Sequence, residues 1–430
     1  MKNRKALALI AILALVAAAC GGSDDAAEEV VEEVTEAVEE VIEEVEEVIE
    51  EVSSDPLVLA SLMPLSGDLA SLGPGIALGA ALAVEQINAA GGINGQPVVL
   101  IEGDSGCDGA VALTSLNDVI AQGAQGVMGA ACSGTSLAIL DTAIAAEVVM
   151  VSPSNTSPQF TKIDKKGFYA RTAPSDLLQG DVLASLLVED GVQTVSIISR
   201  ADSYGRGLAE ATAAAFEAAG GTVKTIVYHA TDATEFTSEV TAVGKGGADA
   251  IVGILFPETG CGVLQPAFEQ GLLDTPWYMT DGVKDAGLAS LCGLGTALDG
   301  FKGTAPGSAA GEAKDAFEAA YAGVSADGSP TFIFAPQAYD AVMLMAISAA
   351  ANGVTGPEIA SGLVAASSGG EKCIGVACIA LAADGVDVDY VGASGEIELN
   401  DAGDPTAATY DIWTTEGDTN PVLESVDFGS

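Results

Sequence analysis

Two hydroxyl residues and one carboxylate stand where the chain could hold a small charged molecule. Ser133 and Thr156 each come shortly after an apolar run, where the chain opens into a helix or a turn. Their hydroxyls and the free backbone N–H groups there would converge on an anion. Asp281, after another apolar run, would accept hydrogen bonds from a cation. Structural alternatives stay open, because Ser133 suits the N-cap of a helix reaching Ala146 and Asp281 suits the cap of a short helix near Val283.

A cysteine near the N-terminus, Cys20, follows a short apolar segment. Residues 6–19 are apolar after a basic start and are too short to span a bilayer comfortably, which predicts a secretory signal peptide at 1–19. Three alanines precede Cys20 and two glycines follow it, a pattern that resembles the lipobox of bacterial lipoproteins, although Ala17 stands where that motif prefers leucine. The resemblance implies an acylated thiol that anchors the protein to a membrane surface. Ordinary cleavage that leaves a free thiol is the alternative.

The remaining cysteines form an even set, which outside the cytoplasm predicts three disulfides. Counting alone does not fix their pairing. Metal binding is the weaker alternative, because the chain has a single histidine, His229, and most of these cysteines are widely spaced. The set comprises Cys107, Cys132, Cys261, Cys292, Cys373 and Cys378.

The chain is strongly acidic, with 61 acidic and 15 basic residues and a formal net charge of −46. Such a charge repels nucleic acid, so we expect no nucleic-acid partner. Residues 24–55 hold 16 of the carboxylates and no positive charge, which marks them as a low-complexity segment. Valines recur there at alternating steps of three and four, on one seam of a helix. A short coiled coil or stiff stalk and a disordered acidic tether both fit this pattern.

From residue 57 the chain alternates short apolar runs with alanine-rich segments of helical length, which predicts an α/β fold. Because right-handed βαβ units join parallel strands, the two series of alternations predict two doubly wound parallel sheets. Ligands bind beyond the carboxyl ends of such strands, so the facing ends would define a cleft. We expect strands at 57–62, 98–102, 126–129, 148–151, 195–199, 222–228, 250–255, 277–279, 395–399 and 408–413, and helices at 75–89, 108–122, 134–146, 203–219, 235–245 and 260–271.

Five short motifs, in order, link this pattern to a known family. They are Ala-Ser-Leu-Met-Pro-Leu-Ser-Gly at 60–67, Gln-Ile-Asn-Ala-Ala-Gly-Gly-Ile-Asn-Gly at 86–95, Gly-Cys-Asp at 106–108, Gly-Ala-Ala-Cys-Ser-Gly at 129–134 and Ser-Pro-Ser-Asn-Thr-Ser-Pro at 152–158. Each is weak alone, and together they are specific. From residue 56 to the C-terminus the chain resembles the type I periplasmic binding proteins of the branched-chain amino-acid class, the Leu/Ile/Val-binding family.

The resemblance implies two ligand-binding lobes joined by a hinge of three crossings, near residues 173, 304 and 400. The first lobe would comprise 56–173 and 304–400, and the second 174–303 and 401–430, after a signal peptide at 1–19 and a lipidated, acidic tether at 20–55. In the family, the cysteines that match Cys107 and Cys132 are bonded to each other. Under that assignment Cys373 pairs with Cys378, and Cys261 with Cys292.

The resemblance also assigns the polar ligand contacts. Family members hold a ligand carboxylate with the residues at the positions of Ser133, Ser154 and Thr156. Asp281 stands where amino-acid binders often carry a glutamate for the ligand ammonium. Because aspartate is one methylene shorter, we expect a broader class of small zwitterions or amides than the branched-chain amino acids.

Three bulky residues would complete the pocket. Tyr204 and Phe256 match family positions that pack over the ligand from the second lobe, although aromatic residues after a strand are also often part of the core. Leu72 stands where many relatives place an aromatic side chain, which predicts a roomier or less stacked pocket.

The resemblance therefore implies the extracytoplasmic, lipid-anchored substrate-binding component of an ABC transporter. It would capture a small amino acid or amino-acid-like solute between two closing lobes and deliver it to a membrane permease. We expect no enzyme activity, metal or cofactor, because His229 lies away from any nucleophile and no phosphate-binding glycine loop follows the first strand. A sensor subunit that reports the solute to a membrane receptor is the alternative, and neighbouring permease genes would favour transport.

Overall fold

The computed structural model describes residues 55–428. The expected signal peptide at 1–19, the expected lipid-bearing Cys20 and all but the last residue of the acidic segment 20–55 lie outside the described residues. Within 55–428, none of the helices combines the length and the apolar character that a membrane span requires.

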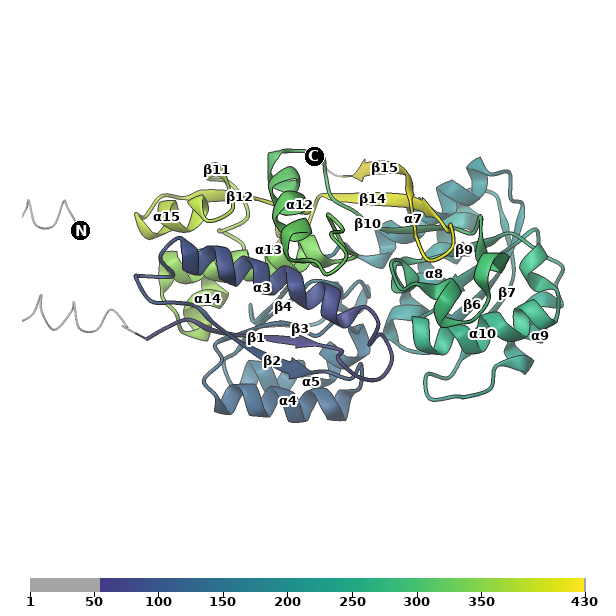
Figure 1. Ribbon diagram of the computed structural model, residues 1–430, viewed down its shortest axis with the longest axis horizontal. Helices are drawn as coiled ribbons and strands as arrows, with labels where there is room; N and C mark the ends of the chain where they lie inside the picture. Colours follow the sequence, from purple (N-terminus) through teal and green to yellow (C-terminus); the bar gives the residue numbers. More distant parts are fainter. Residues whose placement is uncertain (1–54, 429–430) are drawn as a thin grey trace, which may run out of the picture. The chain divides into compact units, whose positions relative to one another are not determined.

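The first sheet has five parallel strands in the order β2-β1-β3-β4-β5. Helix α3 (Gly73–Ala89) covers one face together with α13 (Ala335–Asn352), and α4 (Gly109–Ala121) and α5 (Ser133–Ala145) cover the other (Figure 1). We call this sheet and these helices the first lobe. The strands are β1 (Val58–Met63), β2 (Val99–Asp104), β3 (Gly126–Gly129), β4 (Val149–Ser152) and β5 (Tyr169–Arg171).

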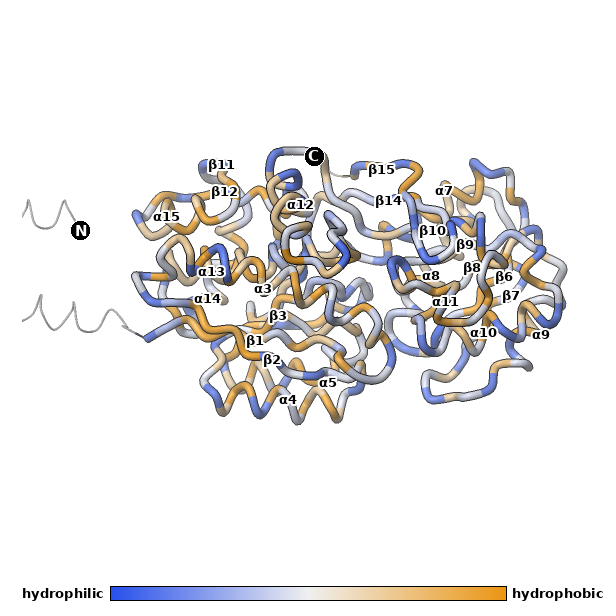
Figure 2. Tube along the Cα trace, in the orientation of Figure 1, coloured by the Kyte–Doolittle hydropathy of each residue, from blue (hydrophilic) through white to orange (hydrophobic). Residues whose placement is uncertain are grey.

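The side chains of β1 show why this sheet needs helices on both faces. Leu59 and Met63 belong to the core on the side of α3 and α13, whereas Ala60 and Leu62 belong to the core that α4 and α5 form. Successive strand residues point to opposite faces, so a strand covered on both sides is apolar throughout. Figure 2 shows that β1 is mainly apolar, and Ser61 is its one polar residue.

The second sheet has seven strands in the order β15-β14-β10-β9-β8-β6-β7. Five are parallel, as expected, but β14 runs antiparallel to β10 and β15 runs antiparallel to β14, so this sheet is mixed. The strands are β6 (Thr194–Arg200), β7 (Thr222–His229), β8 (Ala250–Ile254), β9 (Trp277–Met279), β10 (Lys302–Pro306), β14 (Ala408–Thr414) and β15 (Val422–Phe428).

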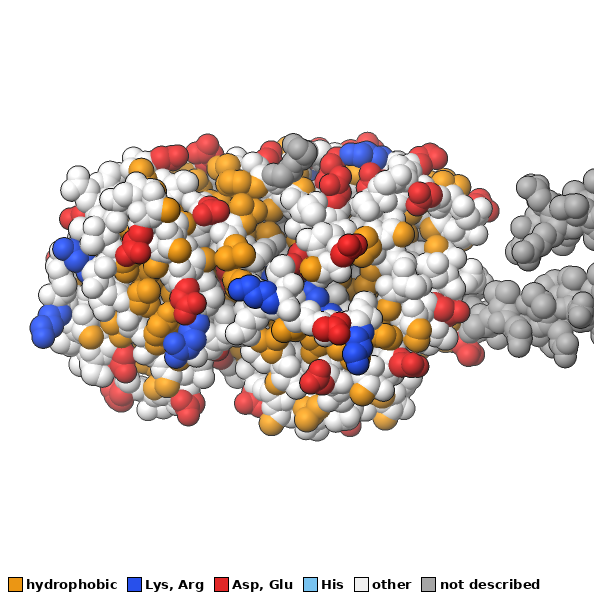
Figure 3. Space-filling view, turned by 180° about the vertical axis from the view of Figure 1, so that it is seen from behind, with side chains coloured by type: hydrophobic (Ala, Val, Ile, Leu, Met, Phe, Trp, Pro, Cys, Tyr) orange, Lys and Arg blue, Asp and Glu red, His pale blue; other side chains and the backbone are white. Residues whose placement is uncertain are grey.

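Two helix pairs accompany the second sheet, and together they form the second lobe. Helix α7 (Asp176–Glu189) packs against α8 (Ser203–Ala218), and α9 (Thr237–Gly244) packs against α10 (Pro257–Glu269). On the face of the molecule shown in Figure 3, acidic side chains are spread over the surface and basic ones are few, so the acidity is not gathered at one site there.

A third, small sheet was not expected from the sequence. It consists of β11 (Glu371–Ile374), β12 (Val388–Gly392) and β13 (Gly395–Glu396), next to α15 (Ala377–Ala383). Helix α14 (Gly356–Gly362) packs against α13 and β4. The strand expected at 395–399 is therefore limited to two residues. Leu399 instead forms an isolated bridge with Pro405 across a turn.

The chain passes between the two large sheets three times: from β5 to β6, from β10 to α12 (Glu312–Val324), and from β13 to β14. All three disulfides implied by the resemblance are present: one lies in each lobe, and the third joins β11 to α15. Their Cα atoms are 5.5 Å apart for Cys107–Cys132, 4.9 Å for Cys261–Cys292 and 5.4 Å for Cys373–Cys378.

Candidate ligand-binding site

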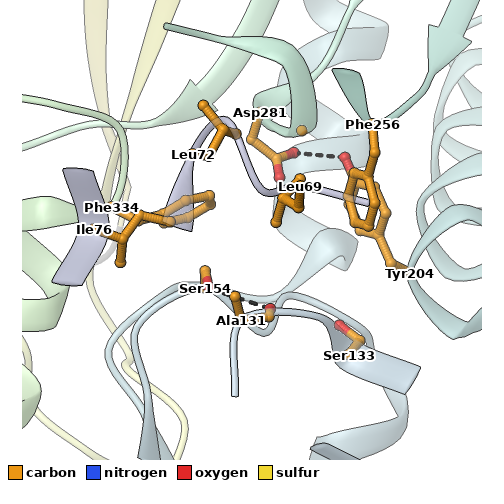
Figure 4. A pocket seen from close by; sticks show the side chains of 11 residues that line it. Leu69, Leu72, Ile76, Ala131, Ser133, Ser154, Tyr204, Phe256, Asp281 and Phe334 are labelled. Carbon is orange, nitrogen blue, oxygen red and sulfur yellow. Dashed lines mark hydrogen bonds between the residues drawn. The ribbon is translucent and has the colours of Figure 1, made fainter. Parts of the chain in front are cut away.

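A pocket of about 320 Å³ lies where residues from both lobes meet. Its polar residues follow the carboxyl ends of parallel strands, where ligands of such sheets bind (Figure 4). The pocket is lined by Leu69, Leu72, Ile76, Ala131, Ser133, Ser154, Tyr204, Phe256, Asp281, Gly282 and Phe334.

Asp281 supplies the only charged side chain among the described residues that line this pocket. It is 3% exposed, and its Oδ1 accepts hydrogen bonds from Gln179 Nε2 at 2.8 Å and from the Tyr204 hydroxyl at 3.0 Å. Burial raises the pKa of Asp281 to about 6, while those two donors lower it. A carboxylate held only by neutral donors in an apolar pocket is well placed to accept a cationic group.

The alternative role of Asp281 as a helix cap is wrong. The short 3₁₀ helix here, η2, spans Asp281–Val283, and its N-cap is Thr280, with no side-chain capping bond. The carboxylate instead accepts hydrogen bonds from Gln179 and Tyr204, and it also contacts its own backbone N–H.

Ser133 and Ser154 place hydroxyls opposite Asp281 in the pocket (Figure 4). Helix α5 begins at Ser133 and its N-cap is Cys132, so the alternative of Ser133 as an N-cap is also wrong. Ser133 Oγ accepts a hydrogen bond from the Ser157 N–H at 3.4 Å, which leaves its own O–H available as a donor. Ser154 Oγ donates to the Ala131 carbonyl at 3.2 Å.

Thr156 lies behind the pocket rather than in its lining. It is fully buried, its carbonyl accepts a hydrogen bond from the Asp176 N–H at 2.8 Å, and its hydroxyl lies against the Asp176 carboxyl. Burial raises the pKa of Asp176 well above its ordinary value, and the nearby Asp281 charge raises it further. Asp176 is thus a second acidic group behind the ligand site, next to one of the residues that the resemblance assigned to it.

Tyr204 and Phe256 form one aromatic wall. Their rings are stacked with centroids 5.3 Å apart at an angle of 14°, and both line the pocket. Burial and the neighbouring Asp281 raise the pKa of Tyr204 well above its ordinary value, so its hydroxyl stays protonated and can donate. The two residues are also buried, at 3% and 5% exposure, so they belong to the hydrophobic core as well as to the pocket lining.

The apolar wall comes mainly from the first lobe. Leu72 lines the pocket as expected, and it is joined by Leu69, Ile76 and Phe334. Phe334, just before α13, supplies an aromatic side chain to this wall. Sequence reasoning missed Phe334, which lies far along the chain from the other lining residues and in no motif.

Comparison with known proteins identifies the family of this chain. A family model described as periplasmic binding protein matches residues 56–372. The chain belongs to the periplasmic binding protein family. This family consists of solute-binding proteins rather than enzymes, and its members work outside the cytoplasm.

The names of several relatives of this periplasmic binding protein state which solutes those relatives bind. An amino acid binding protein of Pseudomonas aeruginosa is 33% identical over 245 residues, which cover 55% of this chain and 63% of that protein. The leucine-, isoleucine-, valine-, threonine-, and alanine-binding protein of the same organism is 29% identical over 315 residues, which cover 71% of this chain and 81% of that protein. The match thus spans less than two thirds of the first relative's length.

Solved structures show the same two-lobe fold. The branched-chain amino acid transporter substrate binding protein LivJ from Streptococcus pneumoniae, in complex with isoleucine, has a TM-score of 0.72 and 22% identity, covering 87% of this chain and 100% of that one. The type I periplasmic binding protein fold expected from the sequence is therefore confirmed.

Proposed function

We propose that this periplasmic binding protein captures a small amino acid or amino-acid-like solute between its lobes and delivers it to an ABC permease. The observation that carries the proposal is the position of buried Asp281 in an apolar pocket, opposite the hydroxyls of Ser133 and Ser154. A zwitterion needs an acceptor at one end and neutral donors at the other. The names of the relatives support the same class of solute.

In the proposed complex the solute carboxylate receives hydrogen bonds from Ser133 and from backbone N–H groups at the start of α5. Ser154 joins them when its hydroxyl turns from the Ala131 carbonyl to the solute. The ammonium lies against Asp281, the charged side chain among the described residues that line the pocket. The apolar side chain packs against the wall that includes Leu72 and Phe334.

These contacts are sufficient for useful affinity. Micromolar binding requires about 8 kcal/mol. Charge-assisted hydrogen bonds contribute about 1.5–3 kcal/mol each, and burial of an apolar side chain adds about 1.5–3 kcal/mol. Two or three such bonds and one side chain together contribute about 4.5–12 kcal/mol, a range that includes this value.

Thermal unfolding with a solute panel tests the proposal. The panel pairs each small L-amino acid with its desamino acid and its decarboxylated amine, so that one charged group is removed at a time. At about 100 times Kd a bound solute stabilises the folded state by about 2.7 kcal/mol, so we expect a clear rise in Tm for amino acids only. The same rise with the desamino acids, or none with any amino acid, contradicts the proposal.

We also propose that Cys20 is acylated and anchors the protein to a membrane. The support is the short apolar segment before Cys20 and the small residues on both sides of it. Intact-mass measurement of protein extracted from membranes should give a chain that starts at Cys20 and carries acyl chains. A Cys20→Ser variant should appear in the soluble fraction, and an unmodified wild-type chain would rule the anchor out.

A further inference from the structure

The loop between β1 and α3 is bonded to the second lobe by carboxylates from both sides. In the first turn of α10, Glu258 accepts hydrogen bonds from the N–H groups of Leu69 at 2.7 Å and Ser71 at 3.0 Å. In return, Asp68 of the loop accepts a hydrogen bond from the Thr259 N–H at 3.3 Å. Each lobe thus contributes a carboxylate that holds backbone of the other.

Arg200 connects this contact to the aromatic wall of the pocket. Its side chain is 3% exposed, it forms an ion pair with Asp68, and its Nη1 donates to Thr259 Oγ1 at 3.0 Å. Its guanidinium carbon lies 3.9 Å from the centroid of the Phe256 ring, whose stacking partner is Tyr204. Arg200 thus contacts both the interlobe residues and the aromatic wall of the ligand site.

A third carboxylate crosses between the lobes elsewhere. Asp285, shortly after η2 in the second lobe, accepts a hydrogen bond from the Ile333 N–H at 2.9 Å. Ile333 directly precedes Phe334, which lines the pocket. The second lobe therefore holds the backbone at or beside two residues of the apolar wall, Leu69 through Glu258 and Phe334 through Asp285.

We propose that Asp68, Glu258 and Asp285, with Arg200, form an interlobe latch that keeps the lobes closed and positions the first-lobe wall of the pocket. The composition explains its chemistry: with 61 acidic and 15 basic residues, few cations are available to pair across a cleft. Backbone N–H groups serve as donors instead, and each such charged bond changes an equilibrium constant by roughly tenfold or more. The latch rests on the proposed closing motion but not on the identity of the solute.

The other interpretation is that each contact only orders its own loop. The two interpretations differ in whether removing one contact changes hydrogen bonding at another contact of the latch. If the contacts act together, removing Glu258 opens the lobes and also frees the Ile333 N–H, although the acceptor of that N–H, Asp285, is intact. If they are local, Ile333 does not respond.

Amide hydrogen exchange of the ligand-free, full-length protein distinguishes these cases. Glu258→Ala should speed exchange at Ile333 by about tenfold or more, and Asp285→Ala should do the same at Leu69. Asp418→Ala is the matched control, because Asp418 accepts a hydrogen bond from the Ser290 N–H at 2.7 Å within the second lobe. The control should speed exchange at Ser290 alone.

Two results would overturn the latch. One is exchange at Ile333 that stays at the wild-type rate in Glu258→Ala, since the contacts would then be independent. The other is amide exchange at Ile333 and Leu69 that speeds up as much in Asp418→Ala as in the latch variants, since that would indicate a general loss of stability. If an alanine variant does not fold, Glu258→Gln and Asp285→Asn are measured and interpreted in the same way. No solute is used, so failure of the latch and failure of the proposed solute class are separate results.

Discussion

Asp281→Asn is expected to weaken binding of an amine-bearing solute by roughly 30-fold to several thousand-fold, because losing one partner of a buried charge pair costs about 2–5 kcal/mol. Asparagine keeps the shape of the side chain and an oxygen that can accept from Gln179 and Tyr204. The loss would therefore report the charge rather than the fold. Isothermal titration with the L-amino acid that gives the largest thermal shift measures it.

The pH dependence of binding provides the control for this variant. Because the pKa of Asp281 is about 6, affinity for an ammonium should fall as pH drops below about 6, approaching tenfold per pH unit. Asp281→Asn should lose this dependence, whereas Asp418→Asn should keep both affinity and dependence. In the ligand-free protein the raised pKa favours the protonated carboxyl, so its contribution to stability is present at low pH and is lost as pH rises through about 6. An Asp281→Asn variant with wild-type affinity would remove the ammonium role.

Arg171→Met is expected to lower the free energy of unfolding by about 3–5 kcal/mol, the usual cost of breaking a buried ion pair. Arg171 is fully buried, and its Nε donates to Asp404 Oδ1 at 2.8 Å. Its Nη1 donates to the carbonyls of Asn155 at 3.1 Å and Ser157 at 3.0 Å. The substitution leaves a buried carboxylate without its cation and two carbonyls without a donor. Urea unfolding followed by circular dichroism measures the change.

Lys302→Met is the matched control for Arg171→Met. Lys302 also pairs with an aspartate, Asp190, at 2.7 Å, but its side chain is 35% exposed. An exposed pair of this kind contributes about 0–1 kcal/mol. The double variant Arg171→Met with Asp404→Leu should regain part of the loss, since no buried charge remains unpaired. Equal losses for Arg171→Met and Lys302→Met would show that burial does not decide the cost.

Several strands that are buried on both faces lie where sequence analysis placed them. β3 and β9 have the expected bounds, and β1, β4 and β8 differ by a residue at one or both ends, because apolar runs alone define such strands. β15 was missed because its residues are largely exposed and alternate with charged side chains, so only its pairing with β14 makes it a strand. β5 is three residues long and includes Arg171, which no hydrophobic pattern marks.

The polar residues of the site were accessible to sequence reasoning because each follows a strand that the sequence defines. Ser133, Ser154 and Asp281 lie beyond β3, β4 and β9, and the topology of parallel sheets brings such ends together. Phe334 and Asp176 were missed, since their places depend on how a distant helix or the chain after a crossing packs against those ends. Only the folded chain brings such residues together.

The three crossings are tied to one another by backbone hydrogen bonds. The Gly307 N–H donates to Thr409 O at 2.8 Å, continuing the ladder of β10 and β14 beyond its last pair, and the Arg171 N–H donates to Gly403 O at 2.9 Å. Strands that bend separately would let one lobe twist, slide or tilt against the other. Because the crossings are coupled, we expect rotation of one lobe about a single axis to cost the least free energy. The lobes would then separate and close again with the residues of the solute site in the same relative positions.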